Sequence, residues 1–351
     1  MTVDEQIRRE QPKAFRSGPR LPGSPPHEGR VPRGGRIKRV LLVVLGVLGL
    51  ILLAVFVVGF ALFRQDLREA RSRLARIPAT IYTSQYGDIQ YRVAGSGPTV
   101  LVSHGITGGV DQAEYLVTRW RNFDERYRFV YVSRFGYLKS SLPDRATPRL
   151  QAAAYKDLLD HLGLERVFVV GNSAGGASAM WFAIDYPERT NGLILLSSAV
   201  PGPEPDAIPG LVREQDFIYW SAVKLAPEML IGLLLPKEVR ATLSDEEKEF
   251  IVENAYMAGL PISERSDGIA FDNEQSNPGV NDVPFERIET PTLIFQAIDD
   301  PRELRGGREM ARRIPNSEFI GLTGGHFLLR QEAEIRAANA AFIATHTNGR
   351  R

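Results

Sequence analysis

The residues with the clearest chemical potential are Ser173 and its neighbours in the stretch VVGNSAGGASAM, Val169 to Met180. An apolar run typical of a strand precedes Ser173, and a small-residue run with helical spacing follows it. In that strand–turn–helix setting Gly171 and Gly175 allow close backbone packing, and a serine at the apex of a strained turn exposes its hydroxyl. The N-terminus of the new helix adds positive potential where an oxyanion would form. The pattern predicts a nucleophile, and the alternative is a glycine turn in which the serine only caps the helix.

A serine hydroxyl is a poor nucleophile unless a base takes its proton, so a histidine must lie close to it. The chain has five histidines: His27, His104, His161, His326 and His346. His326 is the best placed, because TGGHF follows the last expected strand and a loop at a strand's carboxyl end can reach a serine at the next. His104 ends an earlier strand in SHGITGG, and we expect it to shape that loop rather than to act as the base.

The base in turn needs an acid that fixes its tautomer and stabilises the imidazolium. The stretch FQAIDDPREL, after the penultimate expected strand, offers Asp299 and Asp300. The residues alone do not decide which of these two aspartates is the acid.

The surrounding elements predict how these residues are positioned. Apolar strand-like runs alternate with helical runs over residues 80–202 and 286–351, which predicts an α/β domain with a mostly parallel central sheet and helices on both faces. Residues 203–285 break the alternation, since they are helical in pattern, aromatic-rich and strandless. We expect this insertion to form a helical cap or lid over the carboxyl edge of the sheet, and extra helices packed on the fold are the alternative.

From about Thr80 to Thr347 the sequence resembles the α/β-hydrolase fold family with a helical cap. The serine turn, the His-Gly loop, the late aspartates and the last-strand histidine fall in the family's order. The family's acid sits in a pattern like G-x-x-D. The resemblance therefore implies Asp300 rather than Asp299 as the acid, with Ala297 replacing the glycine.

The resemblance also implies an oxyanion hole made of two backbone N–H groups, those of Ile106 and Ala174. One departure is SRFGY, where many relatives carry Asp in place of Ser133. We interpret it as a loop variant that does not touch the catalytic residues.

The beginning of the chain has a different character. Residues 1–39 are rich in Pro, Gly and Arg, which predicts a disordered basic tail. Val40 to Phe63 carries no charged residue and is long enough for a single transmembrane helix, and residues 64–79 are expected to be a connector. The basic residues before the run are packed closer than those after it, which predicts a cytoplasmic N-terminus and an extracytoplasmic catalytic domain.

The composition narrows the chemistry further. The chain has 351 residues, a formal net charge of +1 and no cysteine, which excludes disulfides, thiol nucleophiles and thiolate metal sites. A serine at position 173 disfavours relatives with an aspartate nucleophile, such as haloalkane dehalogenases and epoxide hydrolases.

We therefore expect a membrane-anchored carboxylic-ester hydrolase acting on a hydrophobic small molecule, with no cofactor, no metal and no nucleic-acid partner. The alternative is a carbon–carbon bond hydrolase of ring-cleavage products, because GNSAGG resembles that group's serine turn. An inactive membrane-tethered binding protein is an alternative of another class.

Overall fold

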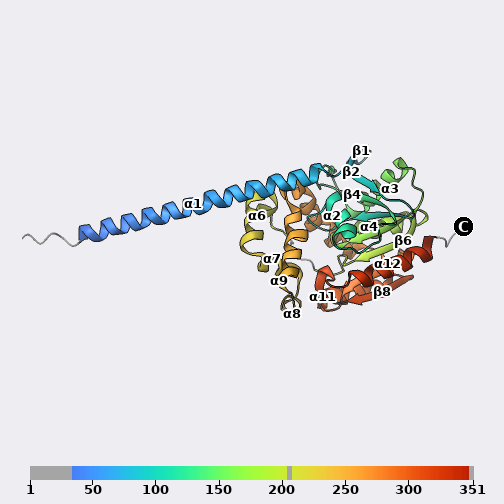
Figure 1. Cartoon of the computed structure of the whole chain (residues 1–351). Coiled ribbons are helices and arrows are strands. Elements are labelled where there is room, and N and C mark those ends of the chain that lie inside the picture. Colours follow the sequence, from blue (N-terminus) through green and yellow to red (C-terminus); the bar gives the residue numbers. More distant parts are fainter. Residues whose placement is uncertain (1–33, 204–207, 348–351) are drawn as a thin grey trace, which may run out of the picture. The chain divides into compact units, whose positions relative to one another are not determined.

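The computed structural model describes residues 34–203 and 208–347 (Figure 1). The chain divides into two units, residues 1–57 and 58–351. The first unit contains the start of α1 (Gly34–Ala75), whose side chains are exposed from Ile37 to Val57. The segment Ile37–Ala75 is long and apolar enough to cross a membrane, with a mean hydropathy of 3.3 over its best window. The predicted tail lies outside the described residues up to residue 33, and residues 34–39 are helical.

The second unit is built around one eight-stranded sheet in the order β1-β2-β4-β3-β5-β6-β7-β8. The strands are β1 (Thr80–Ser84), β2 (Gly87–Ala94), β3 (Thr99–Ser103), β4 (Arg128–Val132), β5 (Val167–Asn172), β6 (Thr190–Leu196), β7 (Thr292–Ala297) and β8 (Ser317–Leu322). β2 pairs antiparallel with β1 and β4, and the pairings from β4 through β8 are parallel. The predicted fold class, a mostly parallel sheet, is confirmed.

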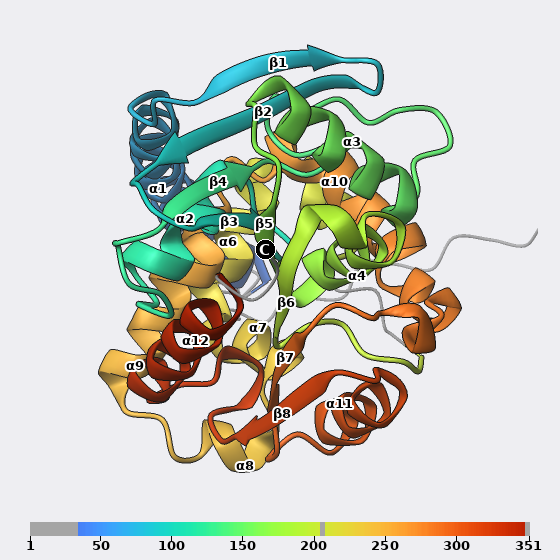
Figure 2. The ribbon, with the colours of Figure 1, turned by 90° about the vertical axis from the view of Figure 1, so that its right-hand side faces the viewer.

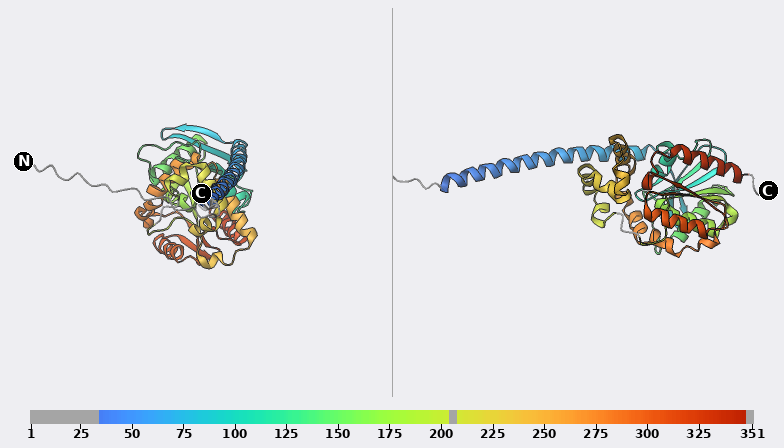
Figure 3. Two further views of the ribbon diagram at one scale, coloured as in Figure 1. Left: turned by 90° about the vertical axis from the view of Figure 1, so that its left-hand side faces the viewer. Right: turned by 90° about the horizontal axis from the view of Figure 1, so that it is seen from below.

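Helices cover both faces of this sheet (Figure 2). The helices α3 (Pro148–His161), α4 (Gly176–Asp185) and α11 (Pro301–Arg313) pack on one face, whereas α2 (Val110–Thr118) and α12 (Glu332–Thr347) pack on the other. The second view in Figure 3 shows the sheet between these helical layers. The side chains of the central strands β3 and β5 are buried between them, which explains why both strands read as continuous apolar runs.

The described part of residues 203–285 is helical and strandless. Its α-helices are α5 (Gly210–Glu214), α6 (Asp216–Leu225), α7 (Pro227–Leu234), α8 (Lys237–Arg240), α9 (Asp245–Ile251) and α10 (Ser266–Phe271), joined by short 3-10 and π turns. We call residues 208–285 the cap. Two fully buried ion pairs tie it to the sheet domain, Arg134 to Asp272 at 2.5 Å and Arg265 to Asp111 at 2.8 Å. A buried charge is stable only when it is paired, so these contacts fix the register of the cap on the domain.

The end of α1 also packs on the cap. The helix continues through the expected connector as far as Ala75, and Phe63, Leu67 and Ala70 are buried in the same apolar cluster as the cap side chains. Arg73 donates hydrogen bonds to the carbonyl oxygens of Ala258 and Leu260. Residues 64–75 are therefore a structural part of the second unit rather than a loose connection.

Candidate active site

Ser173 lies at a strained turn between β5 and α4. Its φ is +49°, in the left-handed region that costs free energy for a residue with a side chain. The flanking glycines allow this turn, because a Cβ on Gly175 would lie 2.2 Å from the carbonyl oxygen of Ser103, and one on Gly171 would lie 2.7 Å from Gly176 Cα. The structure thus gives Ser173 the backbone conformation expected of a serine nucleophile.

The structure brings His326 to Ser173 across 153 residues of sequence. His326 Nε2 lies 3.0 Å from Ser173 Oγ, within hydrogen-bond distance. The histidine sits in a single 3-10 turn after β8, Gly325–Phe327, which Gly324 precedes at φ +104°. A Cβ on Gly324 would lie 2.3 Å from the nitrogen of Leu329, so the loop that carries the imidazole requires a glycine there.

The acid that contacts His326 is Glu303, not the predicted Asp300. His326 Nδ1 lies 2.6 Å from Glu303 Oε1, and the Glu303 side chain is almost fully buried. Asp300 instead caps α11, with Oδ1 accepting hydrogen bonds from the backbone N–H groups of Arg302 and Glu303. This corrects the sequence prediction: a carboxylate that caps the helix turns toward the helix, and the carboxylate one turn later turns toward the imidazole.

Asp299 has a third function. Its two carboxylate oxygens accept hydrogen bonds from the N–H groups of Gly324, at 2.8 Å, and Gly325, at 3.0 Å. It therefore fixes the loop that carries His326 without contacting the imidazole itself.

A sequence signal for Glu303 was present. The run Asp300-Pro301-Arg302-Glu303 has an N-cap residue, proline at the first helical position and glutamate at the third, which is a helix-start signature. A helix that begins at Pro301 assigns Asp300 to the cap and puts Glu303 in the first turn. There the helix dipole favours a carboxylate.

The loop after β3 lies against the nucleophile. A Cβ on Gly105 would lie 3.0 Å from Ser173 Cβ. His104, which precedes it, is fully buried, with Nδ1 2.7 Å from the carbonyl oxygen of Gly105 and Nε2 accepting the N–H of Arg134 at 3.0 Å. These two bonds require the neutral imidazole with its proton on Nδ1. Burial first, and the charge of Arg134 second, hold the pKa of His104 well below its usual value.

His104 is thus a structural residue of this loop, as its position in the sequence suggested. The assignment of the Ile106 and Ala174 N–H groups as an oxyanion hole stays a prediction that the closeness of Gly105 to Ser173 supports. Ser133 binds Gln90 Oε1 and the N–H of Val110, which is a structural contact between β2, β4 and α2.

A cavity of about 70 Å³ is lined by His326 and by Asn172, the residue before Ser173. Its lining residues come from the domain and the cap: Gln112, Leu116, Trp120, Asn122, Asn172, Leu196, Ser197, Asn254, Ala255, His326, Phe327 and Leu328. Among the described residues, the buried oxygens Gln112 Oε1 and Ser197 Oγ have no hydrogen-bond partner.

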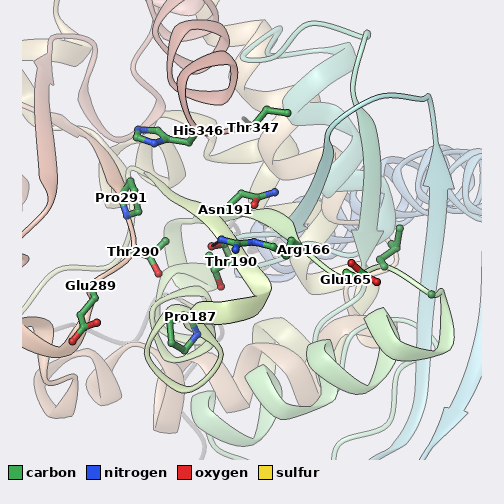
Figure 4. A pocket seen from close by; sticks show the side chains of 12 residues that line it. Glu165, Arg166, Pro187, Thr190, Asn191, Glu289, Thr290, Pro291, His346 and Thr347 are labelled. Atoms are coloured by element: carbon green, nitrogen blue, oxygen red, sulfur yellow. Dashed lines mark hydrogen bonds between the residues drawn. The ribbon is translucent and has the colours of Figure 1, made fainter. Parts of the chain in front are cut away.

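A larger cavity, of about 520 Å³, lies elsewhere (Figure 4). Arg166, Thr190 and Pro291 in its wall stand at the amino ends of β5, β6 and β7. Ser173 follows the carboxyl end of β5, so this cavity lies at the opposite edge of the sheet and does not belong to the site.

Residues 98–333, more than half of the chain, match the sequence profile of the α/β hydrolase fold family. The chain belongs to the α/β-hydrolase fold family. An α/β-hydrolase fold protein from Nakamurella multipartita has a similar structure, with 25% sequence identity and a TM-score of 0.58 over 75% of this chain and 98% of the other.

Curated relatives match a shorter part of this α/β-hydrolase. The 2-hydroxy-6-oxo-6-phenylhexa-2,4-dienoate hydrolase of Comamonas testosteroni is 40% identical over 31% of this chain and 39% of its own length. The 2-hydroxy-6-oxononadienedioate/2-hydroxy-6-oxononatrienedioate hydrolase of Paraburkholderia xenovorans is 35% identical over 33% of this chain and 43% of its own length. The chain thus spans about two fifths of the length of these relatives.

Proposed function

We propose that this chain is a serine hydrolase with Ser173 as nucleophile, His326 as general base and Glu303 as the acid that orients it. The observation that carries this proposal is the continuous contact from Ser173 Oγ through both ring nitrogens of His326 to Glu303, at 3.0 and 2.6 Å. The relatives named as dienoate hydrolases favour cleavage of a carbon–carbon bond in a ring-cleavage product over the ester hydrolysis first expected.

The geometry supports a two-step reaction. Ser173 Oγ attacks a ketone carbonyl carbon while His326 Nε2 takes its proton, and Glu303 stabilises the imidazolium through Nδ1–H. The oxyanion of the tetrahedral intermediate accepts hydrogen bonds from the N–H groups of Ile106 and Ala174. Its collapse breaks the carbon–carbon bond, and the leaving carbon takes the proton that the His326 imidazolium holds, which returns His326 to its neutral form. Water, deprotonated by His326, then hydrolyses the acyl-enzyme and releases a carboxylic acid.

A carboxylic ester is the second candidate substrate, and the wall of the small cavity favours it. Among the described residues that line it, none is Arg or Lys. A dienoate carries a carboxylate that a buried site would have to pair with a cation or with several hydrogen-bond donors. A neutral ester needs only the amide and hydroxyl groups of Gln112, Asn172 and Ser197. In that reaction an alcohol leaves in place of the carbon fragment.

The cavity also sets a condition on binding. At about 70 Å³ it is smaller than typical ligand pockets, which begin near ~300 Å³. A hydrophobic substrate therefore has to displace cap side chains such as those of Asn254 and Ala255. We expect the cap to determine which substrates enter.

We also propose that residues 40–63 anchor the enzyme in a membrane, with the N-terminus cytoplasmic and the catalytic unit on the other side. The apolar exposed helix and the unequal spacing of basic residues around it support this proposal. The full-length chain should sediment with membranes and dissolve only in detergent. Recovery in the high-speed supernatant without detergent would contradict the anchor.

The substrate test compares two series on one enzyme preparation. We expect kcat/KM for a 2-hydroxy-6-oxo-dienoate to exceed that for p-nitrophenyl esters of rising acyl length, with Ser173→Ala as the control that abolishes both. Fast ester turnover with no dienoate cleavage would select the second candidate. Absence of labelling of Ser173 by a fluorophosphonate would overturn the hydrolase proposal and favour an inactive binding protein.

A further inference from the structure

A second cavity lies beside the small one that His326 lines. It has a volume of about 530 Å³ and lies where the end of α2, the cap helix α9 and the start of α12 meet (Figure 2). Its walls are residues 118–122, Glu246, Glu247, Phe250, residues 327–330 and Glu332. We call it the outer groove. Its volume falls within the range of about 300–1,000 Å³ that is typical of ligand pockets.

The outer groove and the small cavity share part of their walls. Trp120, Asn122, Phe327 and Leu328 line both. Another groove of the same unit, of about 280 Å³ and lined in part by Leu243, has no described lining residue in common with the small cavity. Of these two grooves, the outer groove is therefore the one placed to lead into the small cavity.

Trp120 stands at the boundary between the two spaces. Its ring stacks on that of Phe327, with centroids 5.5 Å apart and an angle of 12°, and Phe250 meets it edge-on at 5.0 Å. Phe250 belongs to the cap and Phe327 directly follows His326, so one indole joins the cap to the loop of the base. Trp120 is only partly buried. Aromatic pairs add little beyond the area they bury, so this ring can turn away at modest cost.

The two walls that flank Trp120 are joined to each other independently of its ring. Arg330, on the loop of His326, donates two hydrogen bonds of 2.6 Å to the Glu247 carboxylate of α9 and one of 2.9 Å to the carbonyl oxygen of Thr242. A bidentate arginine–carboxylate pair holds both groups in one geometry. The cap and the loop of His326 therefore stay in register when the Trp120 ring moves.

We propose that substrate enters through the outer groove, and that Trp120 closes the passage to His326 and Ser173 and limits the size of what passes. The proposal rests on the serine hydrolase function proposed above. With the Trp120 ring in place, the space beside His326 is about 70 Å³. When the ring turns away, this space joins the outer groove and admits a larger substrate. Trp120 thus determines specificity by size and takes no part in the chemistry.

The test compares a small and a bulky reagent for the same serine. Dimethyl and diphenyl phosphorofluoridate both phosphorylate a serine Oγ and release fluoride. Intact-mass spectrometry of the full-length chain in detergent gives the rate constant for modification of Ser173 by each reagent. The quantity of interest is the ratio of the diphenyl to the dimethyl rate constant, because a change in the reactivity of Ser173 alone cancels in this ratio.

Trp120→Ala should raise the ratio about tenfold or more, since a change in pocket size alters discrimination by about 10–200-fold. Trp120→Phe keeps a ring and should raise it less than about threefold. Phe250→Ala frees one side of the indole and should shift the ratio in the same direction, which provides the test should Trp120→Ala fail to fold by circular dichroism. Leu243→Ala is the matched control beside the other groove, and its ratio should stay within about twofold of that of the wild type.

An unchanged ratio in Trp120→Ala and Phe250→Ala, with Ser173 still modified, would overturn the entry proposal and leave the hydrolase function standing. An equal fall in both rate constants would overturn it as well and assign Trp120 to support of the His326 loop. A rise of the same size in Leu243→Ala would refute the role of Trp120 and show a general loosening of the cap. Failure of both reagents to modify Ser173 in the wild type would overturn the hydrolase function and the entry proposal together.

Discussion

Three segments at the carboxyl edge of the sheet supply the candidate catalytic groups, and the segments after β5 and after β7 position theirs in different ways. The loop after β5 positions Ser173 through the backbone, by a left-handed φ and two glycines that permit close packing. The segment after β7 positions its acid through a helix, because Asp300 caps α11 and so places Glu303 in the first turn. The flanking glycines single out Ser173 in the sequence. Glu303, in contrast, lies close to two other carboxylates, Asp299 and Asp300, and only the start of the helix tells them apart.

The comparison predicts that the largest loss of activity follows from a substitution at Ser173, in the loop after β5. Ser173→Ala should lower kcat by on the order of 10⁴ or more with the fold intact, because it removes the hydroxyl that lies 3.0 Å from His326 Nε2. Circular dichroism provides the folding control. A variant that keeps more than about a hundredth of the wild-type kcat would show that Ser173 is not the nucleophile.

The segment after β7 offers a sharper test, since Asp300 and Glu303 are only three residues apart and have different partners. Glu303→Gln should lower kcat by on the order of 10²–10⁴, because the amide no longer stabilises the imidazolium. Asp300→Asn is the matched control and should cost less than about tenfold, since Asn is also a good N-cap. A larger loss from Asp300→Asn would restore the aspartate as the catalytic acid and refute the assignment of Glu303.

A third loop, the one after β3, is held by contacts with the cap and with the end of α1. Arg265 donates a hydrogen bond to the carbonyl oxygen of Gly108 in that loop, and Arg73 reaches the same Asp111 that Arg265 binds.

A chain that begins at Arg76 should therefore be less stable than one that begins at Val58. Deleting Phe63 and Leu67 removes about 1.5–3 kcal/mol of burial each. Urea unfolding of both truncated chains measures this difference, and equal midpoints would show that residues 58–75 are only a connector.

The smallest expected effect concerns His104 in the same loop. Burial keeps its pKa well below 6.5 in the folded chain, while the unfolded chain takes up a proton below about that pH. The unfolded state then binds more protons, so the free energy of unfolding falls as the pH drops below about 6.5. His104→Gln should remove about 1.4 kcal/mol per pH unit from this slope between about pH 6.5 and pH 5. An unchanged slope would show that His104 is not held neutral.

The sequence by itself predicted the mostly parallel sheet and singled out Ser173 and His326 as candidates, which the fold brings within 3.0 Å of each other. Apolar runs of strand length, glycines at positions that tolerate no side chain, and a histidine on a loop after a strand are local features, each with one physical cause. These features can be recognised in the sequence because the backbone requires particular residue types at particular positions.

Only the tertiary structure decided which carboxylate meets the imidazole and what the end of α1 contacts. Asp299, Asp300 and Glu303 differ in direction rather than in chemistry, and direction depends on where α11 starts and how the loop of His326 folds back. Likewise, apolar residues such as Phe63 and Leu67 are equally suited to a membrane-spanning helix and to the core of the cap, where the structure places them. The contact that settles the first alternative joins Glu303 and His326, 23 positions apart, and the one that settles the second joins Phe63 and Trp220, 157 positions apart. Local sequence patterns do not record such contacts.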